Sequence, residues 1–134
     1  MRYQVMDHTA DVMVRCTGKD LEECFANAAY AMFDQMIDAD SVALSETVEI
    51  EAEGKDDESR LYAFLSELLF VFDCDRKVFR EFSVSFDGDR VKCVAEGEPL
   101  DLDRHRPRAE IKAVTYHMLQ VDRGTPSVTV IFDV

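Results

Sequence analysis

The chain has 134 residues, of which 47% are hydrophobic and 32% are charged, a balance typical of one globular domain and not of a disordered or fibrous protein. Its 28 acidic and 15 basic residues give a net charge of −13, so its electrostatic field repels nucleic-acid phosphates and anionic membranes. We therefore expect no strong direct binding of nucleic acid, whereas high solubility, cation binding and docking on a basic protein are all compatible with this charge.

The first elements predicted along the chain are a strand and a long helix. Residues 12–16 alternate between apolar and other side chains, which predicts a strand. Asp20 is followed three positions later by Glu23, which resembles a capping box, and apolar residues then recur at helical spacing. We predict an amphipathic helix over residues 21–36.

The middle of the chain predicts a strand, a second helix and a hairpin. Residues 47–53 alternate Thr-Val-Glu-Ile-Glu-Ala-Glu, the pattern of a strand with one exposed face. An apolar stripe with a 3.6-residue period then runs from about Asp57 to Asp73 and predicts a second amphipathic helix. Alternation resumes over residues 78–96 on both sides of Asp87-Gly88, which predicts a β-hairpin.

The last third of the chain is less regular. Pro107 follows a polar stretch and suits the first position of a helix, so we predict a short third helix over residues 108–116. A strand is the alternative, because this segment contains several β-branched and aromatic residues. Residues 118–121 and 127–132 predict two closing strands joined by a turn.

The order of these elements favours an α+β fold. Strands mixed with isolated long helices, with few strict strand-helix-strand alternations, argue against a doubly wound parallel sheet. We predict a single domain over residues 1–134, with mixed or antiparallel sheets, two long amphipathic helices and a short third helix. The order of strands and helices at the two ends also suggests a duplicated strand-helix-strand-strand module.

A small acidic cluster near the amino terminus is a candidate cation site. Asp7, His8 and Asp11 stand together with Thr9 just before the first predicted strand. Oxygen ligands clustered on a loop suit a hard cation such as calcium or magnesium. Spacing alone, however, favours a structural role, with the aspartates in Asx-turns or helix caps and the histidine hydrogen-bonded.

The carboxyl end of the chain could complete such a site. Asp133 and the α-carboxylate of Val134 lie side by side at the end of a predicted strand. If the fold placed them beside Asp11, the three groups would form an oxygen-rich site for a hard cation. The alternative is a frayed and solvated terminus, which is common for final residues.

Other patterns argue for or against further chemistry. The basic run at residues 104–108, with Lys112 at a helical spacing from Arg108, could meet a phosphate or an acidic partner, or it could be a solvated loop. A zinc site is disfavoured because no close pairs of cysteine or histidine ligands occur. There is also no Gly-rich phosphate loop, no G-x-S-x-G elbow and no H-E-x-x-H motif.

The amino terminus and the cysteines predict a cytoplasmic protein. Residues 1–5 lead into polar residues without an apolar signal-peptide stretch, and no segment approaches the ~18 apolar residues of a membrane span. The four cysteines form no C-x-x-C pair, and a chain with a real core does not need disulfides. We read Cys16, Cys24 and Cys93 as small core residues and expect no membrane association; a monomer is favoured.

Five ordered blocks together resemble the archease family, and the similarity spans nearly the whole chain. The blocks are Asp7–Val12, Gly18–Phe25, Gly97-Glu98, Glu110–His117 and Asp133-Val134. The resemblance implies an α+β fold related to strand-helix-strand-strand modules. It also implies an accessory protein, not an enzyme, that activates the RtcB-type tRNA-splicing ligase by promoting its GTP-dependent guanylylation and its multiple turnover.

The resemblance further implies roles for individual residues. It suggests Asp11, Asp133 and Val134 as metal ligands, with calcium as the ion and magnesium or manganese as alternatives. Lys112 falls at a position expected to matter for activating the ligase. Asp7 and His8 match the family motif and are supporting candidates.

Two other functional classes remain alternatives at this level. In a stand-alone metal-dependent phosphohydrolase, the same carboxylates would hold the ion and His8 would act as acid or base. A general protein chaperone or adaptor would act through apolar surface and would not need Asp133.

Overall fold

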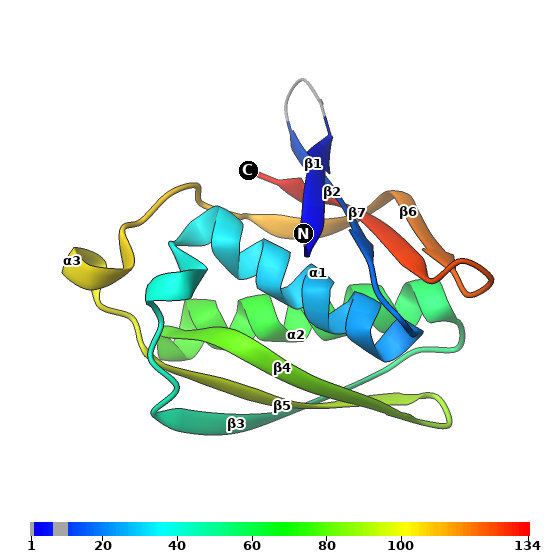
Figure 1. Ribbon diagram of the computed structural model, residues 1–134, viewed down its shortest axis with the longest axis horizontal. Coiled ribbons are helices and arrows are strands. Elements are labelled where there is room, and N and C mark those ends of the chain that lie inside the picture. The colour runs from blue at the N-terminus through cyan, green and yellow to red at the C-terminus, as the bar shows by residue number, and fades with distance from the viewer. Residues whose placement is uncertain (1, 7–10) are drawn as a thin grey trace.

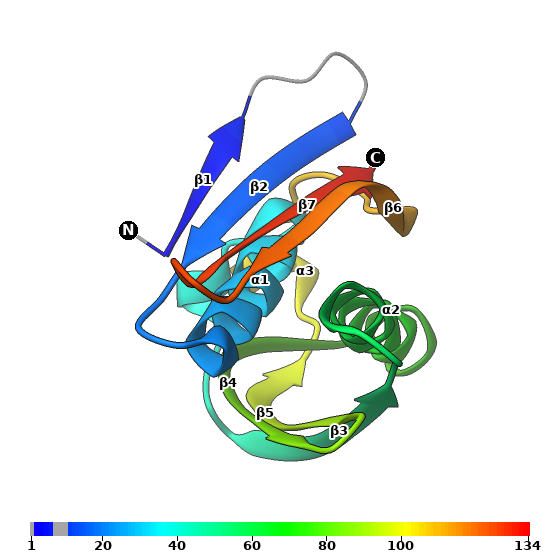
Figure 2. The same ribbon diagram turned by 90° about the vertical axis from the view of Figure 1, so that its right-hand side faces the viewer.

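Two amphipathic helices form the middle layer of the protein, with an antiparallel sheet on either side of them (Figures 1 and 2). The computed structural model describes residues 2–6 and 11–134. The helices are α1 (Leu21–Met36) and α2 (Asp57–Asp75), with a short 3₁₀ helix η1 (Ala39–Ser41) and a short helix α3 (Leu102–His105) at the edge. No helix among these described residues combines the length and the apolar composition that a membrane span requires.

The two sheets differ in size and in the parts of the sequence from which their strands come. The four-stranded sheet has the order β1 (Tyr3–Met6), β2 (Asp11–Thr17), β7 (Ser127–Asp133), β6 (Ala113–Asp122). The three-stranded sheet has the order β3 (Glu46–Glu53), β5 (Arg90–Pro99), β4 (Lys77–Asp87). The larger sheet therefore joins strands from the two ends of the chain, whereas the smaller one is built from its middle.

Local sequence explains where both long helices begin. The Asp20 carboxylate accepts a hydrogen bond from the Glu23 N–H at 2.8 Å, which satisfies one of the open donors of the first turn of α1. At α2 the Asp56 carboxylate accepts from the Ser59 N–H at 2.7 Å, and the Ser59 hydroxyl accepts from the Asp56 N–H. Both predicted helices are thus confirmed within two residues of their expected ends.

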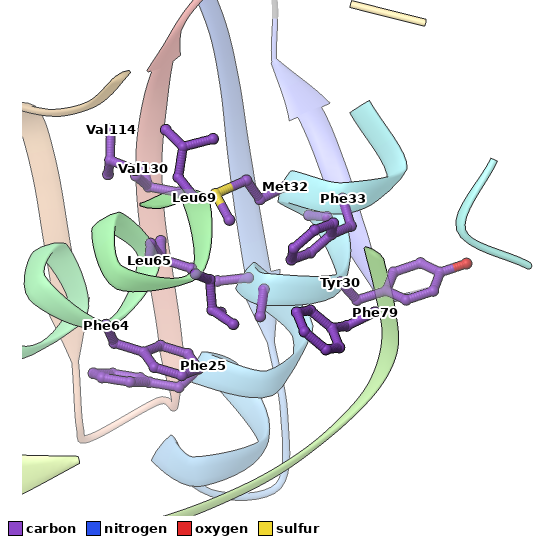
Figure 3. Close-up of a cluster of buried hydrophobic side chains, with 14 of the residues drawn as sticks. Phe25, Tyr30, Met32, Phe33, Phe64, Leu65, Leu69, Phe79, Val114 and Val130 are labelled. Atoms are coloured by element: carbon purple, nitrogen blue, oxygen red, sulfur yellow. The ribbon is translucent and has the colours of Figure 1, made fainter. Parts of the chain in front are cut away.

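The core is continuous across the three layers. Residues 28–33 of α1 are all buried, because a helix between two sheets has little surface facing water. Phe25 of α1 stacks on Phe64 of α2 with ring centroids 6.0 Å apart, and Phe33 meets Phe79 of β4 edge to face at 5.6 Å. Figure 3 shows Phe25 and Phe64 together between the two helices, and Phe33 and Phe79 close to each other beside α1.

The predicted α+β fold is confirmed, including the hairpin and the closing strands. The predicted helix over residues 108–116 is wrong, and its strand alternative is correct from Ala113 onward. The N–H groups of Arg108 and Ala109 donate to the carbonyls of Met36 and Gln35 at 2.8 and 2.9 Å, which ties the start of the segment to the end of α1. The Lys112 N–H donates to the Asp133 carbonyl, and Ala113–Thr115 pair with β7, so backbone groups that a helix would need are used in the sheet.

Three short elements were not predicted: β1, η1 and α3. β1 is four residues long and mostly exposed, so it carries no alternation of apolar and polar positions. α3 lies within the polar stretch that was expected to be irregular and has only four residues. Elements of this length leave too few positions for a periodic pattern.

Candidate metal site at the carboxyl end of the chain

Three strand ends meet at one corner of the four-stranded sheet. Asp11, the first residue of β2, is the Cα partner of Asp133, the last residue of β7. Asp133 is in turn the partner of Ala113, the first residue of β6. The register therefore places the two predicted carboxylates directly opposite each other, although they come from opposite ends of the chain.

Both carboxylates belong to the face of the sheet that points away from the helices. Val14 of β2 and Phe132 of β7 are buried against the core, and successive residues of a strand alternate between the two faces. Asp11 and Asp133 have the opposite parity to these residues, and both are half-buried. They share the outer face, at a position that water and ions can reach.

Two carboxylates face each other in this arrangement. Side chains of directly opposed residues have Cβ atoms about 4.5–5.5 Å apart, and like charges in such a pair destabilise the sheet. The whole chain adds to the repulsion through its net charge of −13. A bound cation would convert this repulsion between Asp11 and Asp133 into attraction.

The last residues are held in place by packing and hydrogen bonding. Val134 is half-buried, and its side chain packs against the hydrophobic core. The Lys112 N–H donates to the Asp133 carbonyl at 2.7 Å. Asp133 and Val134 are therefore anchored by the sheet and the core, and Val134 directly follows the residue that faces Asp11.

The donor set suits a hard cation. Asp11, Asp133 and the Val134 carboxylate offer only oxygen atoms, which calcium, magnesium and manganese prefer over nitrogen or sulfur ligands. Within residues 2–6 and 11–134, no group of three or more His, Cys, Asp or Glu side chains is close enough together to hold a metal ion. The two aspartates would thus need the terminal carboxylate, and backbone or water oxygens, to complete a coordination shell.

Of the three remaining candidate residues, the structure describes only Lys112. Asp7 and His8 lie outside the described residues. Lys112 has an exposed side chain and directly precedes β6, so it lies beside the same row of strand ends. Lys112 and Arg108 do not share a helix face as expected, because residues 106–112 form no helix.

The basic run at residues 104–108 is largely occupied within the chain. Arg108 pairs with Asp34 at 3.2 Å, and Arg104 makes two hydrogen bonds to the Glu98 carboxylate. His105 is fully buried, with its Nε2 2.7 Å from Glu98 Oε2 and its Nδ1 accepting from the Asp101 N–H at 2.9 Å. Arg104 and Arg108 are thus paired within the chain although their side chains remain about half exposed, and only His105 of the run is buried.

Glu98 is a residue that sequence reasoning did not single out for itself. Its carboxylate also accepts from the Ala43 N–H at 2.7 Å. The hydrogen bonds from Arg104 hold the pKa of Glu98 at about 2, against the opposing effect of burial. The signal in the sequence was the Gly97-Glu98 block of the family resemblance, which does not by itself indicate a buried ion pair.

The cysteines behave as the apolar pattern predicted. Cys16, Cys24 and Cys93 are buried free thiols, and Cys74 is exposed at the end of α2. Burial raises the pKa of Cys16 and of Cys93 to about 12, so these thiols stay protonated and unreactive at neutral pH.

Comparison with known proteins shows the family to which the chain is similar. The profile of the Archease protein family matches residues 3–134. The chain is 41% identical over 126 residues to Protein archease of Pyrococcus abyssi, covering 91% of this chain and 89% of that one. It is 40% identical over 138 residues to Protein archease of Ictalurus punctatus, covering 99% and 85%. The solution structure of Methanobacterium thermoautotrophicum protein 1598 superimposes with a TM-score of 0.85 at 37% identity, covering 99% of both chains.

Proposed function

The chain belongs to the archease family, and from this premise we propose that it is an accessory protein that activates an RNA ligase and is not an enzyme itself. Family membership supports an accessory role toward an RNA ligase in general. The finer proposal is that the partner is the RtcB-type tRNA-splicing ligase and that the protein promotes its guanylylation and its multiple turnover. The cytoplasm is the proposed compartment, and a monomer the proposed active form.

The observation that carries the proposal is the pairing of Asp11 with Asp133 at a corner of the sheet. We propose that these two side chains and the Val134 carboxylate hold a divalent cation, calcium in the first place. When bound, such a cation can neutralise negative charge that develops on a phosphoryl group. Strand pairing on both sides of Asp133 fixes the backbone there, and in this way the chain would set the position of the cation.

Charge explains how the protein could find its partner. An RNA ligase must present basic surface to RNA phosphates, and a chain with a net charge of −13 is complementary to such a surface. Lys112 is exposed next to the proposed site, so we propose it as a contact to the ligase or its nucleotide. Asp7 and His8 match the family motif, and for this reason we propose them as supporting groups.

Purified ligase, GTP and this protein suffice for the test of function. We expect the protein to accelerate ligase guanylylation and to convert single-turnover ligation into multiple turnover. Asp11→Asn should lose most of this effect, whereas Asp75→Asn, a charge-matched change at the exposed end of α2, should keep it. Equal rates of guanylylation and ligation with and without the protein would contradict the accessory role. Phosphate-ester hydrolysis by the protein alone, abolished by chelation, would favour the phosphohydrolase instead.

The metal site has its own test, which does not depend on the ligase. Calcium should raise the melting temperature of the wild type, since a ligand at 100 times its Kd stabilises the folded state by about 2.7 kcal/mol. Asp11→Asn should remove this response. An equal response to calcium in both proteins would place the ion elsewhere and leave the accessory role intact.

A further inference from the structure

A pocket of about 490 Å³ opens beside β1 and α1, away from the proposed metal site. Its walls combine two tyrosines, two aspartates, an arginine and an aliphatic residue: Arg2, Tyr3, Val5, Tyr30, Asp34 and Asp40. Figure 3 shows the Tyr30 ring pointing away from the other labelled core side chains. Tyr30 belongs to the core cluster and Tyr3 packs against it, whereas the polar groups of the pocket belong neither to the core nor to the proposed metal site.

The two tyrosines form an aromatic corner that carboxylates hold in place. The rings of Tyr3 and Tyr30 are 6.3 Å apart between centroids and tilted by 52°. The Tyr3 hydroxyl donates to Asp34 at 2.5 Å, and the Tyr30 hydroxyl donates to Asp40 at 2.6 Å. Burial, together with these carboxylates, raises the pKa of Tyr3 to about 12 and raises that of Tyr30 as well, so both phenols stay neutral donors.

The pocket is therefore a negative, aromatic environment. Asp34 is partly neutralised by Arg108 at 3.2 Å. Asp40 has an exposed side chain, and the nearby Arg80 hydrogen-bonds its backbone carbonyl and not its carboxylate. Two electron-rich ring faces next to carboxylates are the combination that recognises an organic cation, because the ring quadrupole and the charge attract it together.

A cation of this class already lies in the pocket. The Arg2 guanidinium is 4.1 Å from the centroid of the Tyr30 ring. Its side chain is 45% exposed, and its ion pair with Glu81 measures 3.6 Å, longer than a hydrogen bond. Exposed contacts of both kinds are weak, so a competing cation can replace Arg2 at little cost.

We propose that this pocket binds an arginine side chain of a basic protein partner, and that Arg2 occupies it in the partner's absence. Arginine fits better than lysine, because its planar guanidinium stacks on an aromatic face as Arg2 does here. A net charge of −13 makes a basic surface the complementary partner. The site and its ligand class follow from these contacts and stand whether or not the partner is the RNA ligase.

The test uses N-acetyl-arginine amide as the probe and NMR of the full chain as the readout. The ring signals of Tyr3 and Tyr30 should shift and saturate with the probe in Arg2→Gln, at an affinity at least several-fold higher than in the wild type. Arg15→Gln, which removes an exposed arginine on β2, is the matched control and should behave like the wild type. The neutral N-acetyl-norleucine amide should not produce the same shifts.

A second variant separates recognition of charge from loss of structure. Asp40→Asn keeps an acceptor for the Tyr30 hydroxyl but removes the charge at an exposed position, so the fold should survive. In the Arg2→Gln background it should weaken the probe several-fold. The proposal is overturned if Arg2→Gln shows no saturable shift at Tyr30, if the neutral amide shifts the same signals equally, or if Arg15→Gln gains as much affinity as Arg2→Gln.

Discussion

At the scale of single residues, one buried carboxylate organises the segment between β5 and β6. The side chain of Glu98 is 9% exposed and bonds Arg104, His105 and the Ala43 N–H. These partners come from α3 and from the loop after η1, so Glu98 joins segments that share no strand pairing. A buried charge with this many donors is stable only while all of them remain in place.

Replacing Glu98 with Gln should lower the free energy of unfolding at pH 7 by about 2–4 kcal/mol, because Arg104 loses its buried partner. The pKa of Glu98 is about 2 in the folded protein against an ordinary 4.5, so the stabilisation is complete above about pH 4.5 and is lost as the pH falls toward 2. Urea unfolding of both proteins between pH 7 and pH 3 measures this. The difference should shrink in acid; a constant difference would contradict the assignment. Glu49→Gln, on an exposed face of β3, is the control.

At the scale of elements, the β4–β5 hairpin contains an irregularity that requires glycine. The register of β4 against β5 shifts between Phe79 and Glu81, opposite Gly97. A Cβ built on Gly97 would lie 1.8 Å from the Val78 carbonyl oxygen and 2.7 Å from the Phe79 Cα. Both atoms belong to the backbone, so the clash cannot be relieved by a rotamer change.

Gly97→Ala should therefore cost at least about 3 kcal/mol of stability or prevent folding. Gly124→Ala is the matched control, since its Cβ would come no closer than 3.4 Å to a side-chain oxygen. Thermal melts and soluble yield of the two variants are the measurements. A Gly97→Ala protein with a wild-type melting temperature would show that the hairpin can shift its register.

An ion-pair cluster joins α2 to the hairpin formed by β6 and β7. Arg123, in the turn of that hairpin, makes two hydrogen bonds to Asp57 in the first turn of α2, at 2.5 and 2.7 Å. Arg60 adds a third to the same carboxylate. The hydrogen bonds from Arg123 lower the pKa of Asp57, and burial opposes them. A carboxylate at a helix N-terminus also complements the helix dipole.

Arg123→Ala should destabilise the protein by about 1 kcal/mol. This value is at the upper end of the range for exposed ion pairs, because the geometry is bidentate. The loss should diminish in 1 M salt, where such pairs are screened. Arg90→Ala, which removes two exposed pairs of 3.7 and 3.8 Å, should cost less. Chemical unfolding at low and high salt decides between these outcomes, and a larger loss for Arg90→Ala would refute the ranking.

At the scale of the whole molecule, charge is the dominant property. With 28 acidic and 15 basic residues, the protein repels other anions and is attracted to basic surfaces over distances near the Debye length, about 8–10 Å at physiological salt. If its partner is an RNA ligase, RNA and this protein are both drawn to positive surface on the same enzyme.

The association rate with the ligase should therefore fall at least about tenfold as the salt concentration rises from 0.01 to 0.15 M, while the dissociation rate changes much less. Stopped-flow mixing at several salt concentrations measures both rates. A salt-independent association rate would show that apolar contact, as in a general chaperone, controls the encounter.

Much of the fold was predictable because it depends on near neighbours. The helices α1 and α2, the strand β3 and the β4–β5 hairpin each carry their own periodicity and caps within a few residues. The error at residues 108–116 arose because the segment bonds to the end of α1 and pairs with β7, which are partners that no local pattern reveals. Glu98 and His105 were not recognised as a buried pair for the same reason.

The sequence by itself determined the oxygen-rich groups at its two ends, the charge of −13 and the likeness to one family. Only the tertiary structure decided that Asp11 stands opposite Asp133, that the Val134 side chain packs on the core, and that Arg2 lies over Tyr30. The physical reason is that residue type and local period are set by neighbours in the chain. Which residues lie next to each other in space depends instead on strand register and on the burial of a shared core, and both involve the whole chain at once.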